Sequence, residues 1–120
     1  MPDLTRTADG ARIGTPLYFA PEQFRGTKYD IDHRTDLFAF GLLLYEAATG
    51  SSAFFVEGMT LQSLEAAVCK SQSAFERDRF QGLPKKLQLL IRKLLSKDRS
   101  ERPREAGQVA IIIGKIGAEL

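Results

Sequence analysis

The sequence has few of the residues that build disulfide frameworks and metal clusters. It contains one cysteine, Cys69, one histidine, His33, and no tryptophan among its 120 residues. A single cysteine cannot form an intrachain disulfide, and one cysteine with one histidine is too few for the usual zinc sites. We therefore expect no metal site, no disulfide and a reducing, cytoplasmic location.

The sequence also lacks a strong charge bias and a long apolar run. Its 17 Lys and Arg against 15 Asp and Glu give a net charge of +2, too small to indicate nucleic acid or an acidic membrane surface as the partner. The longest apolar stretch, residues 37–48, is shorter than the roughly 18 to 20 residues that a membrane-spanning helix needs. Residues 1–7 are polar and no apolar segment follows them, so we expect neither a signal peptide nor a membrane span.

What the sequence does contain is the composition of one ordinary globular domain, with 43% hydrophobic and 27% charged residues. Residues 37–48 are apolar around the whole helical circumference, which predicts a central buried helix with Asp32 as its N-cap and Gly50 at its end. Amphipathic spacing predicts further helices, one over residues 84–97 and two centred on residues 61–68 and 109–116. The apolar positions that predict them are Leu87, Leu90, Ile91, Leu94 and Leu95, then Val109, Ile112, Ile113 and Ile116, and more weakly Leu61, Leu64 and Val68.

No segment alternates apolar and polar residues over enough positions to indicate a strand pair. We therefore expect an all-α fold, with a short helical turn after Pro21. Residues 51–58 and 71–83 are expected to be loops.

Three short strings carry the functional information: GTPLYFAPE at residues 14–22, DLFAFG at 36–41 and KDRSERP at 97–103. In this order and spacing they resemble the C-terminal lobe of a protein kinase, in which an Ala-Pro-Glu motif ends the activation segment. The sequence of residues 34–50 is most similar to those of bacterial Ser/Thr kinases of the eukaryotic type. The resemblance implies a partial protein kinase domain over 1–120, with the end of the activation segment at 1–22, the helical C-lobe at 23–120, and no β-rich N-lobe.

The resemblance also implies roles for residues outside the segment that is expected to receive a protein substrate. Glu22 and Arg102 correspond to an ion pair that ties the activation segment to the helical lobe, a pairing that suits the forked guanidinium. Asp36 corresponds to an aspartate that accepts hydrogen bonds from the backbone of the catalytic loop, and Gly41 belongs to the same central-helix motif. The alternative for Asp36 is a simple first-turn acid that the helix dipole favours.

The substrate segment is expected in the first string. Thr15 corresponds to the threonine that bridges the catalytic aspartate and lysine of Ser/Thr kinases, and is thus an accessory to the missing catalytic loop. Thr5 and Thr7 lie where activation-loop phosphorylation occurs in the family. The residues expected to receive substrate are Gly14, Thr15, Pro16, Leu17 and Tyr18.

The groups that perform phosphoryl transfer in this family are absent from the sequence. It has no G-x-G-x-x-G loop, no lysine strand and no His-Arg-Asp motif, and Asp3-Leu4-Thr5 lacks the Phe and Gly of a magnesium-binding Asp-Phe-Gly. We therefore assign no cofactor-binding or metal-binding residue. We expect the isolated chain to be inactive, although full-length members of the family use Mg-ATP.

The remaining chemically notable residues have plainer interpretations. Residues 85–104 contain eight basic and two acidic residues, which, apart from Arg102, we interpret as a solvated helix face because no aromatics interleave them for stacking on nucleic acid. We interpret His33 as a polar residue at a helix start, and Cys69 as a small packed residue.

Three hypotheses for function stay open at this point. The chain is the inactive C-lobe of a Ser/Thr kinase, or a stand-alone helical module that binds a protein, or one half of a split kinase completed in trans. In each case the partner is a protein: a substrate, the missing N-lobe or a regulator. Part of residues 37–45 should be left uncovered, which favours self-association.

Overall fold

The computed structural model describes residues 16–26 and 32–119, and every regular element in these ranges is helical, so the expected all-α class is confirmed there. Gly14, Thr15, Thr5 and Thr7 lie outside the described residues. The elements are the 3₁₀ turn η1 (Pro16–Tyr18), α1 (Pro21–Arg25), α2 (His33–Thr49), α3 (Leu61–Lys70), the 3₁₀ turn η3 (Ser73–Glu76), α4 (Asp78–Gln81), α5 (Lys85–Leu94), the 3₁₀ turn η4 (Arg99–Glu101) and α6 (Ala106–Glu119). None of the described helices is long and apolar enough to cross a membrane.

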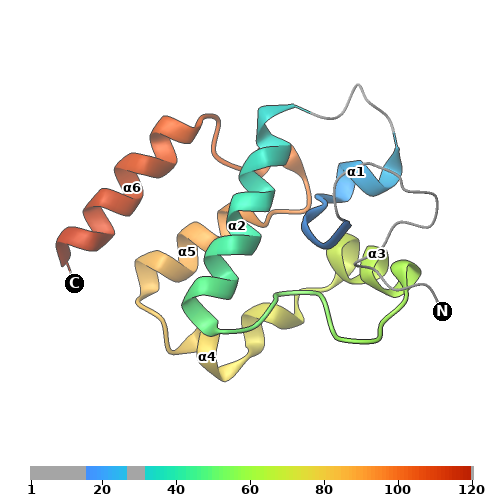
Figure 1. The fold of residues 1–120 in the computed structure, drawn as a ribbon. Helices are drawn as coiled ribbons and strands as arrows, with labels where there is room; N and C mark the ends of the chain where they lie inside the picture. The colour runs from blue at the N-terminus through green and yellow to red at the C-terminus, as the bar shows by residue number, and fades with distance from the viewer. Residues whose placement is uncertain (1–15, 27–31, 120) are drawn as a thin grey trace.

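Helix α2 runs through the middle of the molecule, with α1 and α3 on one side and α5 and α6 on the other (Figure 1). Its start and end are where the sequence predicts them. The Asp32 side chain accepts a hydrogen bond from the backbone N–H of Arg34 at 2.8 Å, and Gly50 ends the helix in the left-handed conformation with φ 85°. The buried side chains of α2 include those of Phe38 and Tyr45, which supports its central role.

Helix α5 crosses α2 closely at Gly41. A Cβ atom at this position would lie 2.8 Å from Cβ of Leu94 and 3.0 Å from Cδ2 of Leu95. The absence of a side chain at Gly41 therefore allows the backbones of the two helices to approach. Helix α5 also ends at Leu94, three residues before the predicted end at Lys97, and Leu95 is its C-cap.

The segment 71–83, expected to be a loop, contains η3 and α4 and contributes to the core. Ala74, Phe75 and Phe80 are buried there. The Tyr45 hydroxyl donates to the carbonyl of Ala74 at 2.7 Å, and the rings of Tyr45 and Phe80 stack with centroids 5.7 Å apart. Each of these elements has four residues, too few for helical periodicity to be visible in the sequence.

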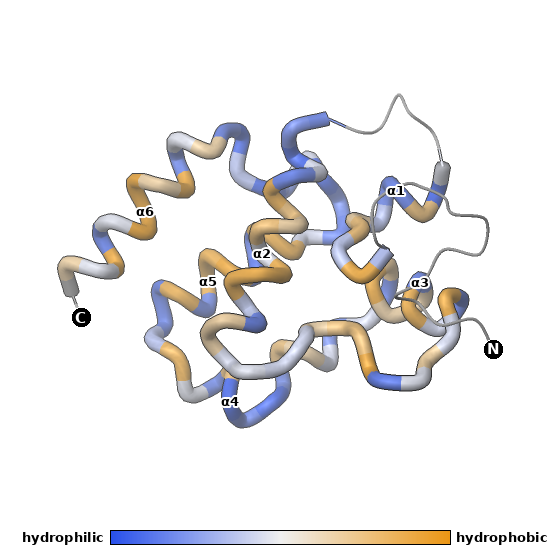
Figure 2. Tube along the Cα trace, in the orientation of Figure 1, coloured by the Kyte–Doolittle hydropathy of each residue, from blue (hydrophilic) through white to orange (hydrophobic). Residues whose placement is uncertain are grey.

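Helix α6 is the least covered of the longer helices. Val109 and Ile116 are buried with Leu90 and Leu94 of α5, while Ile113, which belongs to the same apolar series, is 37% exposed. Figure 2 shows hydrophobic residues along α6 as well as along α2 and α5. The apolar residues of α6 thus outnumber those that the described part of the chain can bury.

Candidate functional site

The first part of the candidate site is a buried ion pair between α1 and the end of the η4 turn. Arg102 donates from Nη1 to Oε2 of Glu22 at 2.7 Å and from Nη2 to Oε1 at 2.9 Å. This two-point contact matches the planar geometry of both groups. The two residues are 80 positions apart, so the pair joins the APE segment to the C-terminal part of the chain.

A third residue completes the contact. The Thr35 hydroxyl, in the first turn of α2, donates to Oε2 of Glu22 at 2.6 Å. Burial by itself raises the pKa of Glu22, but the hydrogen bonds from Arg102 and Thr35 outweigh it and hold the pKa below its ordinary value. The sequence analysis missed Thr35, which has no signal beyond its place next to Asp36.

Arg102 also binds two backbone carbonyls. Its Nε donates to the carbonyl of Ser96 at 2.9 Å and its Nη1 to the carbonyl of Arg34 at 3.0 Å. Its guanidinium lies 4.9 Å from the ring centroid of Phe38. These contacts connect α1, the start of α2 and the chain after α5, so Arg102 fixes three segments relative to each other.

The second part is the chain that leads into α1. Residues 16–18 form η1, in which Leu17 packs against the core and Tyr18 is 36% exposed. Ala20 is fully buried, and its backbone N–H donates to Oε1 of Gln23 at 2.8 Å. The Glu22 pair therefore follows directly on a segment that is itself anchored, while Gly14 and Thr15 lie outside the described residues.

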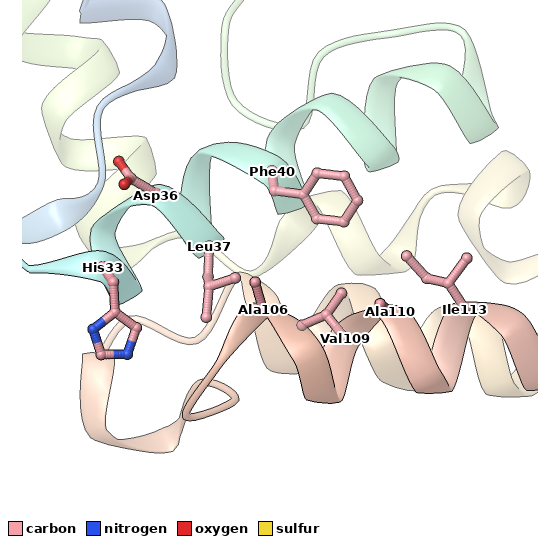
Figure 3. A pocket seen from close by; sticks show the side chains of 8 residues that line it. All are labelled: His33, Asp36, Leu37, Phe40, Ala106, Val109, Ala110 and Ile113. Atoms are coloured by element: carbon pink, nitrogen blue, oxygen red, sulfur yellow. The ribbon is translucent and has the colours of Figure 1, made fainter.

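The third part is an apolar groove between α2 and α6, with a volume of about 430 Å³. We call it the α2–α6 groove. The exposed side chain of Asp36 lies at its edge, and within the described residues no hydrogen bond or ion pair is formed by this carboxylate. Figure 3 shows the lining residues, which are His33, Asp36, Leu37, Phe40, Ala106, Val109, Ala110 and Ile113.

A hydrogen bond joins the start of α2 to the residues just before α6. Nε2 of His33, the first residue of α2, is hydrogen-bonded to the backbone carbonyl of Arg104, just before α6. His33 thus lies at a helix start, as expected, and also holds the start of α6 beside α2.

The basic residues after α5 are not all on a solvated face. Lys97 is half-buried, and its Nζ donates to the carbonyl of Val68 at 2.6 Å and lies 4.1 Å from the ring centroid of Phe54. Burial lowers the pKa of Lys97 to about 8. Cys69, at the end of α3, has its pKa raised by burial, which disfavours the reactive thiolate.

No group of three or more His, Cys, Asp or Glu residues within 16–26 and 32–119 is arranged to hold a metal ion.

The helical arrangement, the APE segment and its buried arginine partner define the class of protein. The sequence model described as the protein kinase domain matches residues 5–110. The chain belongs to the protein kinase family.

Its relatives include bacterial Ser/Thr kinases. The chain is 33% identical over 105 residues to serine/threonine-protein kinase pkn3 of Myxococcus xanthus, with 88% of this chain and 18% of that protein aligned. It is 37% identical over 105 residues to pkn2 of the same organism, covering 84% of this chain and 12% of that protein. It is 32% identical over 106 residues to PknB of Mycobacterium tuberculosis, covering 88% and 16%.

The chain therefore spans less than a fifth of the length of these relatives.

Proposed function

We propose that this chain is the helical C-lobe portion of a Ser/Thr protein kinase, with the end of the activation segment at 1–22 and the lobe proper at 23–120. The observation that carries the proposal is the buried Glu22–Arg102 pair, which holds the APE segment against the helical body. The alignment with bacterial Ser/Thr kinases supports the same assignment.

In the proposed role, residues 14–18 form the turn that receives a protein substrate beside the phosphoacceptor, with Thr15 as an accessory to the catalytic loop. The complete enzyme would transfer phosphate from Mg-ATP to Ser or Thr hydroxyls. The proposed location is the cytoplasm, where the single Cys69 would stay reduced.

The α2–α6 groove supports the proposal that a further part of the domain packs here. Phe40 and Leu43 on α2 are 38% and 51% exposed, and the groove beside them is almost wholly apolar. In the proposed arrangement a preceding helix and the catalytic loop cover this surface, and the Asp36 carboxylate accepts hydrogen bonds from the loop backbone. An exposed apolar surface of this kind is typical of an interface whose partner is absent.

We propose that the chain by itself does not transfer phosphate, because the sequence lacks the glycine loop, the strand lysine and the catalytic-loop aspartate on which the transfer depends. Isothermal titration of the chain with Mg-ATP is expected to give no heat of binding above dilution. Measurable binding, or phosphorylation of a test protein by the chain alone, would overturn the proposal.

The same exposed surface favours two further candidates, a protein-binding module and the trans-complementing half of a split kinase. Co-expression with the N-terminal part of a related kinase, up to and including its catalytic loop, distinguishes the binding module from the split kinase. Stable association lost on Leu43→Asp, with restored phosphorylation, supports a split enzyme. Association without activity supports a binding module, and no association contradicts both.

A further inference from the structure

Helix α2 carries two buried threonines that use their hydroxyl groups in different ways. Thr35 and Thr49 are each 3% exposed. The Thr49 hydroxyl donates to the carbonyl of Tyr45, four residues earlier, at 2.8 Å, which is the usual local contact of a threonine in a helix. The Thr35 hydroxyl donates instead to Oε2 of Glu22, 13 residues earlier and on another helix, at 2.6 Å. Thr35 therefore uses its one side-chain donor for a tertiary contact.

The first turn of α2 fixes the direction of the Thr35 hydroxyl. The backbone N–H of Asp32, the N-cap, donates to Oγ1 of Thr35 at 3.4 Å as part of a capping box. A hydroxyl has one proton, and because its oxygen already accepts from Asp32, that proton is directed to Glu22. The backbone carbonyl of Arg34, in the same turn, accepts from Nη1 of Arg102 at 3.0 Å. The start of α2 thus contacts both members of the Glu22–Arg102 pair.

The side chains that contact the Glu22 carboxylate, within the described residues, are all donors. They are the two Nη groups of Arg102 and the hydroxyl of Thr35. Such a set stabilises the ionised carboxylate and offers no acceptor to a protonated one. Arg102 by itself fixes the carboxylate relative to one long side chain, whereas the bond from Thr35 fixes it relative to α2 as well.

We propose that Thr35 is a positioning residue, whose hydroxyl sets the orientation of the Glu22 carboxylate and thereby holds the APE segment, residues 20–22, in place against the start of α2. Residues 16–19 lead directly into this segment, so their position depends on the same contact. The consequence for the turn that receives a protein substrate rests on the proposed function, whereas the contact itself does not.

An NMR titration of the full chain with carbon-13-labelled glutamate tests the contact through the pKa of Glu22. Thr35→Val keeps the shape of the side chain but removes the hydroxyl, so the pKa of Glu22 should rise toward its ordinary value of 4.5 or beyond. Thr35→Ser, which keeps the hydroxyl, should restore the low pKa. Thr49→Val removes an equally buried hydroxyl from the same helix and should leave the pKa of Glu22 unchanged.

The other charged groups near Glu22 are the same in all these variants, so the differences between variants report the hydroxyl. Arg102 faces the carboxylate directly. The remaining charged groups line a cleft together with Glu22, and they are Arg25, Lys97, Asp98 and Arg99.

Hydrogen exchange gives a second readout, on the APE segment itself. The backbone N–H of Ala20 donates to Oε1 of Gln23, and that of Leu95 donates to the carbonyl of Ile91 at the end of α5. In Thr35→Val the exchange rate at Ala20 relative to Leu95 should rise about tenfold, as the loss of one charge-assisted hydrogen bond implies. Thr49→Val should leave this ratio unchanged.

The proposal is overturned if Thr35→Val leaves the pKa of Glu22 or the exchange ratio unchanged, if Thr35→Ser does not restore both, or if Thr49→Val changes them as much. If circular dichroism shows that Thr35→Val does not fold, the original chain supplies the test. Its Thr35 hydroxyl proton should give a slowly exchanging NMR signal that changes as Glu22 is protonated, and absence of that signal also overturns the proposal. Failure to take part in substrate phosphorylation would contradict only the proposed function and would leave the Glu22 titration as expected.

Discussion

At the scale of single residues, the Glu22–Arg102 pair combines burial with nearly complete hydrogen bonding. The Arg102 side chain has no exposed area and that of Glu22 is 5% exposed. Such a pair adds little when compared with apolar residues of the same size, but removing one partner leaves a buried charge without compensation. The pair therefore acts mainly by making the position of the APE segment specific.

Replacing one member of the pair tests this role. Arg102→Met should lower the free energy of unfolding by about 3–5 kcal/mol, because the Glu22 carboxylate stays buried without its partner. Urea denaturation followed by circular dichroism measures the change. Arg104→Met, at an exposed position two residues later, should change stability by less than about 0.5 kcal/mol, and equal losses in the two variants would contradict the role assigned to the pair.

The pair also makes stability depend on pH in the acid range. The pKa of Glu22 lies below its ordinary value of 4.5 in the folded chain, so its stabilising contribution is complete above pH 4.5 and is lost as the pH falls through the folded pKa. Glu22→Gln should reduce the loss of melting temperature between pH 5 and pH 3. Asp32 and Asp98, whose pKa values are also lowered, should maintain part of the dependence in both proteins.

Lys97 has the opposite effect in the alkaline range. Its pKa is about 8 in the folded chain against the ordinary 10.5, so the unfolded chain holds a proton that the folded chain has lost between these values, and stability rises with pH there. Lys97→Met should remove this rise relative to the original chain, whereas Lys93→Met should retain it. The comparison must be made as a difference between variants, because the raised pKa values of Tyr45 and Cys69 act in the other direction.

At the scale of elements, the crossing of α2 and α5 depends on Gly41. An added methyl group would lie 2.8 Å from Leu94, so Gly41→Ala must push the two helices apart. The cost of overpacking, about 1–3 kcal/mol, should exceed the gain of about 1 kcal/mol in helix propensity. Gly114→Ala on α6 is the matched control, since nothing lies within 4 Å of its Cβ position, and it should stabilise the chain. A melting temperature that rises in both variants would show that α5 moves to make room for the added methyl group, and would contradict the prediction.

The elements also differ in how visible they are in the sequence. The caps of α2 at Asp32 and Gly50 are local signals, and the structure confirms them. The 3₁₀ turn η3 and the short helix α4 have no such signals, because their apolar residues Phe75 and Phe80 become part of the core only through contact with Tyr45 and each other. Their burial follows from packing between distant segments and could not be predicted from local pattern.

At the scale of the whole molecule, the α2–α6 groove is an apolar surface that the described chain leaves open. Phe40 lies on this surface and is 38% exposed, and we expect the isolated chain to bind a hydrophobic dye and to self-associate. Phe40→Ser should reduce both, as measured by dye fluorescence and sedimentation velocity. Leu89→Ser, at a position on α5 that is 65% exposed and outside the groove, should have less effect. A monomeric chain that binds no dye and melts cooperatively would contradict this expectation.

The sequence by itself determined the family, the all-helical class, the extent of the central helix and the identity of Glu22 and Arg102 as residues of interest. The helix caps and the helical periodicity are local patterns, and the family resemblance, from which Glu22 and Arg102 were singled out, rests on three short strings in a fixed order and spacing. Only the tertiary structure decided that Thr35 joins the ion pair, that Lys97 is half-buried against Phe54, and that Ile113 lies at a groove rather than in the core. Burial and the compensation of charge depend on segments that are far apart in the chain, so local pattern carries little information about them.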